Sequence, residues 1–150
     1  MLYFIIYGII AIWVFFDAKK RNNNIFGWAI GTFIIGPFML PFYLAKRNLK
    51  NDEVREGGTA WNVLKNFALV WTITMLITGT FSFVGAGSVI NQSASDAEQV
   101  GAVIGTGLGM GFIFLIWFIP MISALIIGLF MKKSSVVEKG PSRELSNGNN

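Results

Sequence analysis

The sequence predicts an all-α integral membrane protein with four transmembrane helices arranged as two hairpins. The first observation is composition: of 150 residues, 53% are hydrophobic and only 13% are charged, against about 25% charged residues in a typical soluble domain. The second is that four long runs contain no Asp, Glu, Lys or Arg. The third is that the basic residues gather between these runs, as they do in cytoplasmic loops of membrane proteins.

The four uncharged runs predict the positions of the spans, because about 20 apolar residues cross a bilayer as a helix. The first run is short, and no Lys or Arg precedes it. No pattern of small residues that would mark signal-peptide cleavage follows Phe16, so we interpret this run as an uncleaved helix. A single transmembrane domain over residues 1–131 is expected, with spans at about residues 2–16, 25–45, 66–90 and 100–131.

Prolines interrupt two of these runs. The second run contains Gly36-Pro37 and Pro41, and the fourth contains Pro120. A proline removes a backbone donor and crowds the carbonyl four residues earlier, so it kinks or breaks a helix. We therefore expect helix breaks at all of these positions.

The sign of the loop charges predicts the orientation. Basic residues are in excess in three segments, residues 17–24, 46–65 and 132–150. In residues 91–99 the only charged residues are the acidic Asp96 and Glu98. Because positive loops stay in the cytoplasm, the third run leads outward, the fourth returns, and the C-terminus is cytoplasmic. The topogenic residues are Lys19, Lys20, Arg21, Lys46, Arg47, Lys132 and Lys133.

The N-terminal half offers two arrangements. Four simple spans would place Lys19–Arg21 outside, against the charge rule. In the alternative the second run is re-entrant, bending at Gly36-Pro37, and all twelve basic residues stay inside. Non-helical backbone at that depth must be buried in protein, and so small a chain has little protein with which to bury it. We expect four spans and keep the re-entrant arrangement as the alternative.

Small and hydroxylated residues predict helix-packing faces. Gly101, Gly105 and Gly109 form a stripe without side chains that allows another helix to approach closely. This stripe suits either self-association or an intramolecular seat for the third run, whose Thr74, Thr78 and Ser82 share one face. These hydroxyls could line a polar path, or they could bond to carbonyls of their own helix.

The sequence offers little material for catalysis. His and Cys are absent, which excludes an imidazole base, a thiol nucleophile and zinc coordination by these side chains. All carboxylates lie in loops or the tail. We therefore expect no catalytic residues, no cofactor and no metal site. The basic clusters are smaller than the four to eight residues of a lipid-specific site, so we interpret them as topogenic anchors that also touch headgroups, with no role in binding nucleic acid.

One stretch carries a resemblance. It reads Asp17-Ala18-Lys19-Lys20-Arg21, then Trp28, Gly36-Pro37, Pro41-x-Tyr43-Leu44 and Arg47. It resembles a helical hairpin of many small bacterial multi-pass inner-membrane proteins with no assigned activity. The hairpin is also similar to anchors that precede cytoplasmic modules. The resemblance implies an origin in a bacterial inner membrane and implies no biochemical role.

These observations favour a non-catalytic accessory or assembly subunit that packs against other membrane proteins or itself, with the lipid bilayer as its constant partner. The alternative is a small channel or transporter that uses the Gly36-Pro37 break and the Thr/Ser face of the third helix. From residue 132 to residue 150 the polar composition predicts a disordered cytoplasmic tail.

Overall fold

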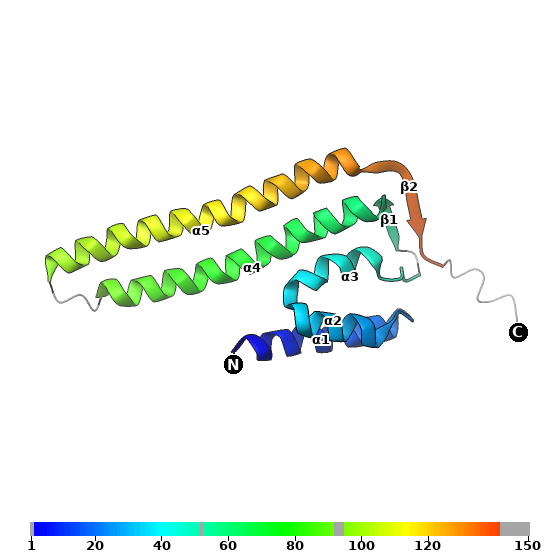
Figure 1. Ribbon diagram of the computed structural model, residues 1–150, viewed down its shortest axis with the longest axis horizontal. Coiled ribbons are helices and arrows are strands. Elements are labelled where there is room, and N and C mark those ends of the chain that lie inside the picture. The colour runs from blue at the N-terminus through cyan, green and yellow to red at the C-terminus, as the bar shows by residue number, and fades with distance from the viewer. Residues whose placement is uncertain (1, 52, 92–94, 142–150) are drawn as a thin grey trace, which may run out of the picture. The chain divides into compact units, whose positions relative to one another are not determined.

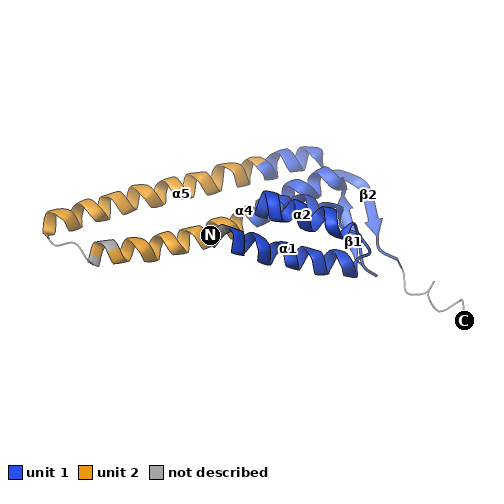
Figure 2. Cartoon of the chain, turned by 60° about the horizontal axis from the view of Figure 1, so that its bottom comes forward, with its two compact units in different colours: residues 1–70, 124–150 blue, residues 71–123 orange. Residues whose placement is uncertain are grey.

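A computed structural model describes residues 2–51, 53–91 and 95–141. The chain is mostly helical and divides into two compact units (Figure 2). The first unit comprises residues 1–70 and 124–150, and the second comprises residues 71–123. The helical fold class is as expected. The single transmembrane domain expected over residues 1–131 stays a prediction.

The first unit begins with helices α1 (Leu2–Lys20) and α2 (Ile25–Ile35), joined by a tight turn. Asn22 adopts a left-handed conformation with φ 52°, which Asn tolerates better than most residues. Asn24 then caps α2, because its side-chain oxygen accepts a hydrogen bond from the Gly27 nitrogen at 3.0 Å. The turn therefore has its own local sequence signals.

The second uncharged run is interrupted in the middle. Helix α2 ends at Gly36, whose φ of 71° favours glycine. A 3₁₀ turn, η1 (Gly36–Met39), follows with Pro37 at its start, and α3 (Leu40–Lys46) has Pro41 in its first turn. Proline suits such first-turn positions because its missing N–H needs no partner there. The break expected at Gly36-Pro37 lies at η1.

At this break the chain reverses direction (Figure 1). Gly36 lies against the ring of Tyr7, in the first half of α1. Seven residues further on, the Tyr43 hydroxyl donates a hydrogen bond to Asp17, in the last turns of α1. Helix α2 therefore runs back along α1, and α3 returns toward the end of α1. The buried core between α1, α2 and α3 consists of Val14, Ala18 and Tyr43. Packed around them are Ile25, Trp28, Leu40 and Leu44.

The first unit also contains a two-stranded antiparallel sheet. Strand β1 (Val54–Gly57) pairs with β2 (Lys133–Lys139), with Val54 opposite Lys139 and an irregularity between Glu56 and Gly57. The tail was expected to be disordered from residue 132, so strand β2 corrects that expectation for its own residues. Its pairing partner lies about 80 positions earlier in the chain, which a local compositional argument does not detect. Residues 142–150 of the expected tail lie outside the described residues.

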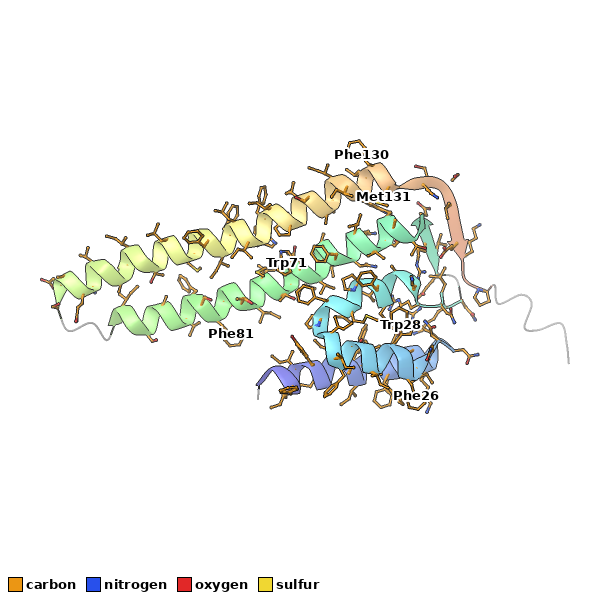
Figure 3. The ribbon with its side chains drawn as sticks, viewed as in Figure 1. Phe26, Trp28, Trp71, Phe81, Phe130 and Met131 are labelled. Atoms are coloured by element: carbon orange, nitrogen blue, oxygen red, sulfur yellow. The ribbon has the colours of Figure 1, made fainter. Side chains whose placement is uncertain are left out.

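Two long helices continue from this sheet into the second unit. Helix α4 (Gly58–Asn91) contributes residues 71–91 and α5 (Asp96–Met131) contributes residues 96–123. Within that unit the Trp71 indole nitrogen donates to the carbonyls of Ile116 and Trp117, both at 3.2 Å. The Trp117 indole nitrogen in turn donates to the Thr72 hydroxyl at 3.1 Å. Many other large apolar side chains are exposed, and Phe81 projects away from α5 (Figure 3).

Helix α5 passes through Pro120 without a break, which corrects the expectation of a helix break there. Residue 120 has no N–H to donate to the carbonyl of Ile116, four residues earlier. That carbonyl accepts the Trp71 indole N–H instead. Neighbouring helices commonly satisfy backbone groups freed by proline in this way.

Among the residues that the structure describes, three segments are long and apolar enough to cross a membrane: Ile25–Lys46, Gly58–Ser88 and Asp96–Met131. The expected count of four spans is therefore not confirmed. Length and composition alone qualify Ile25–Lys46, yet this segment doubles back at η1. A straight crossing requires the two ends of a segment to lie far apart, whereas hydrogen bonds between Arg21 and Asn48 hold the ends of this one close together.

Candidate functional site

A polar cluster lies at the end of α1, where the returning α3 and the loop after it meet the helix. It consists of Asp17, Arg21, Tyr43, Arg47, Asn48 and Glu53, all in the first unit. Asp17 and Arg21 are one helical turn apart, so their side chains share a face of α1. The other members come from positions 26 to 36 residues later in the chain. The cluster therefore joins α1 to a distant part of the sequence.

Arg21 occupies the centre of the polar cluster, with its side chain only 4% exposed. Its Nε donates to both carboxylate oxygens of Asp17, at 3.1 and 3.0 Å. Its Nη1 and Nη2 donate to the two carboxylate oxygens of Glu53, at 2.7 and 3.1 Å, a bidentate pair of the strong, directional kind. Arg21 thus holds two carboxylates from different segments.

Asp17 is held by three side chains. Besides Arg21, the Tyr43 hydroxyl donates to its Oδ2 at 2.6 Å and Arg47 Nη1 donates to the same oxygen at 3.3 Å. Tyr43 is fully buried, and the rings of Trp13 and Trp28 pack against it edge to face. Packing that fixes the tyrosine ring also fixes the position of its hydroxyl donor.

Hydrogen bonds join the loop after α3 to the turn after α1. Arg21 Nη1 donates to the Asn48 carbonyl at 2.9 Å, and Asn48 Nδ2 donates to the carbonyls of Arg21 and Asn22, both at 3.1 Å. Glu53 also accepts a hydrogen bond from the Lys50 backbone nitrogen at 3.0 Å. The two ends of the segment Ile25–Lys46 therefore lie side by side.

Charge pairing shifts the pKa values of two residues of the polar cluster, Arg21 and Glu53, which lie outside the apolar segments. Hydrogen bonds from the Arg21 side chain and the Lys50 backbone lower the pKa of Glu53 to about 2. The Glu53 carboxylate, in turn, raises the pKa of Arg21, against the opposing effect of burial. Both groups therefore stay charged and paired across the physiological pH range.

This arrangement suits a structural role, in which paired charges hold separate segments of the chain together. Guanidinium, phenol and backbone donors occupy the carboxylate oxygens of Asp17 and Glu53, and a carboxylate committed in this way is a poor general base. Within residues 2–51, 53–91 and 95–141, no group of three or more Asp or Glu side chains lies close enough together to hold a metal ion.

The structure separates the residues expected to be topogenic into two groups. Arg21 and Arg47 belong to the polar cluster. The remaining members are exposed on the surface of the first unit, and they are Lys19, Lys20, Lys46, Lys132 and Lys133.

Glycines of the expected packing stripe lie in the second unit, on α5. Apart from the neighbouring residues and the backbone of α5 itself, a Cβ at Gly101, Gly105 or Gly109 would meet no described atom within 4 Å. On α4, the Thr78 hydroxyl donates to the Thr74 carbonyl at 2.9 Å, and Ser82 lies one turn further along. The glycine stripe does not form a close seat for this hydroxyl face within the described residues.

Sequence reasoning did not assign Asp17, Tyr43, Asn48 and Glu53 to a common site. One signal was present, because the motif that carries the hairpin resemblance contains Asp17, Arg21, Tyr43 and Arg47. Comparison with protein-family models, curated protein sequences and solved structures found no match to this chain.

Proposed function

We propose that the chain is a multi-pass protein of a bacterial inner membrane whose N-terminal half contains a re-entrant hairpin. In this topology α1, α4 and α5 cross the bilayer, whereas α2 and α3 enter it and return. The support comes from the hydrogen bonds between Arg21 and Asn48, which hold both ends of Ile25–Lys46 together.

This topology agrees with the charges. The loop ends at Arg21 and Arg47 lie in one cluster, and strand pairing brings the start of α4 beside the end of α5. All twelve Lys and Arg residues then face the cytoplasm with the C-terminus, while Asp96 and Glu98 face outward, in accord with the positive-inside rule.

Within the membrane, the protein acts as a non-catalytic accessory or assembly subunit through helix packing with other membrane proteins or with itself. The observation that carries this function is the open stripe of Gly101, Gly105 and Gly109. Such a stripe lets a partner helix approach closely and gain van der Waals contact, which drives association in lipid. Large apolar side chains flank it, among them Ile104 and Leu108, which are 59% and 64% exposed.

A channel or transporter has less support. The Thr78 and Thr80 hydroxyls donate to carbonyls of their own helix, at 2.9 and 2.8 Å, so they offer fewer free groups to a passing solute. The ring of Tyr7 lies against Gly36 at the helix break. These contacts fill the two features on which that alternative depended.

Two glycine substitutions on opposite faces of α5 test the packing function. Gly105→Leu fills the open stripe, while Gly107→Leu, about 200° around the helix, makes the same chemical change on the other side. A Cβ at either position is free of neighbours, so both variants should fold.

If the partner is another membrane protein, we expect Gly105→Leu to abolish its capture. If the partner is a second copy, we expect the same substitution to abolish resonance energy transfer between labelled copies in liposomes. Gly107→Leu should leave association intact. Equal effects of the two substitutions, or none from either, would contradict a role for this stripe.

A further inference from the structure

The first unit contains a hollow of about 630 Å³ that the polar cluster only borders. We call it the basic pocket. Strand β1 lines one side, the end of α3 and the following loop another, and the first turns of α4 a third. Its basic lining residues are Arg47, Arg55, Lys65 and Lys132, and its acidic ones are Glu53 and Glu56.

Two of these charged groups are already committed to other partners. Glu53 is bound by Arg21 and by the Lys50 nitrogen. Arg55 donates to the carbonyls of Leu44 and Arg47, at 3.4 and 2.7 Å, and pairs with Glu138 at 3.3 Å. The remaining charged lining residues are Arg47, Lys65 and Lys132 against the single carboxylate of Glu56, so an excess of positive charge remains.

Three basic side chains keep donor capacity. The guanidinium of Arg47 makes one hydrogen bond among the described residues, the 3.3 Å contact with Asp17. Lys65 and Lys132 pair with no carboxylate of the part of the chain that the structure describes. The Lys132 ammonium lies 5.7 Å from the centre of the Trp61 ring, and this contact holds it over the α4 side of the pocket.

The lining and the volume of the pocket also suit an anion that carries an apolar part. Helix α4 begins at Gly58, so its positive dipole end lies beside the lining residues Trp61 and Asn62. Leu44, Leu49 and Leu69 supply an apolar part of the wall. Its volume falls in the range of small-molecule sites.

We infer that the basic pocket binds a phosphate group through Arg47, Lys65 and Lys132. The group can be the phosphodiester of an anionic lipid headgroup, with its acyl chains beside Leu44 and Leu69, or a free phosphate. Arginine and lysine are the usual protein partners of phosphate oxygens. This site is independent of the glycine stripe and of association through it.

Native mass spectrometry of the full-length protein in a neutral detergent tests the inference. One arm adds phosphatidylglycerol and the other inorganic phosphate, with phosphatidylcholine as the lipid reference. The test variant is Lys65→Gln with Lys132→Gln. The matched control is Lys19→Gln with Lys20→Gln, which removes equal charge from exposed lysines outside the pocket.

The expected result is one tightly bound phosphate-bearing species. A basic residue near an anionic surface contributes about fivefold in affinity, so losing both pocket lysines should weaken binding about 25-fold. The control should change affinity less than twofold. Retention of phosphatidylglycerol identifies a lipid ligand, and retention of phosphate alone identifies a soluble one. Absence of binding in both arms, or equal weakening in test and control variants, would overturn the inference.

Discussion

Arg21 and Asn48 exchange hydrogen bonds across the start and end of an apolar hairpin. The Arg21 guanidinium donates to the Asn48 carbonyl at 2.9 Å, and the Asn48 amide donates to the Arg21 carbonyl at 3.1 Å. The segment Ile25–Lys46 between them is apolar enough to cross a membrane, yet its two ends lie together. These hydrogen bonds therefore close the hairpin at its two ends.

Replacing Arg21 should weaken the closure most. Arg21→Gln leaves the carboxylates of Asp17 and Glu53 without their shared partner, and removing one member of a buried pair costs about 3 kcal/mol. The free energy of unfolding, measured by SDS titration in mixed micelles, should fall by about this amount. Lys20→Gln, at the neighbouring exposed position, should change it by less than about 0.5 kcal/mol. Similar losses of unfolding free energy in both variants would contradict a specific stabilising role for the cluster.

The hydrogen bond between Tyr43 and Asp17 should be measurable by a double-mutant cycle. Tyr43→Phe keeps the buried ring but removes the donor 2.6 Å from Asp17, and a hydrogen bond to a charged group contributes about 2 kcal/mol. Asp17→Asn should reduce the cost of Tyr43→Phe, since the acceptor is then uncharged. Additive effects of the two substitutions on unfolding would argue against a direct bond.

Acid should loosen the first unit in a defined range. The pKa of Glu53 is about 2 in the folded protein, lowered from an ordinary value of 4.5. Its stabilising contribution is therefore complete above pH 4.5 and is lost as the pH falls toward 2. The side chain is 37% exposed, so the loss should be only about 1 kcal/mol. Glu53→Gln should flatten the dependence of the unfolding free energy on pH between 4.5 and 2, and an unchanged slope would contradict the pairing.

In the second unit, the cost of removing the Trp71 donor should depend on Pro120. Trp71→Phe removes the N–H that satisfies the Ile116 carbonyl, at a cost of about 1 kcal/mol. In a Pro120→Ala background the new backbone N–H can bond that carbonyl, so the same substitution should cost less. Equal costs in both backgrounds, measured by SDS titration, would contradict the compensation.

Much of the fold follows from local sequence rules. The helical segments and the interruption at Gly36-Pro37 were predicted because apolar length and the backbone limits of glycine and proline act locally. Length could not distinguish a crossing from a reversal, because 22 residues suffice for either one span or two short arms. The position of Lys19–Arg21 was the sequence feature that favoured reversal.

The polar cluster could be predicted only in part from the sequence. The four-residue spacing of Asp17 and Arg21 predicts a shared helix face, but Tyr43 and Glu53 reach them only after the chain has turned twice. The sign of a charge predicts its side of a membrane and not its partner. The pairing of Val54 with Lys139 and the contact of Trp71 with Ile116 are likewise non-local, and no local pattern specifies either.

Cysteine labelling of Asn23 tests the re-entrant hairpin most directly, because the native chain contains no cysteine. Single substitutions Asn23→Cys, Ala97→Cys and Ser135→Cys would be treated with a membrane-impermeant maleimide in spheroplasts, before and after permeabilisation. The re-entrant topology predicts that Asn23→Cys reacts only after permeabilisation, as Ser135→Cys does, whereas Ala97→Cys reacts in intact spheroplasts. Reaction of Asn23→Cys in intact spheroplasts, alongside Ala97→Cys, would contradict it and support four simple spans.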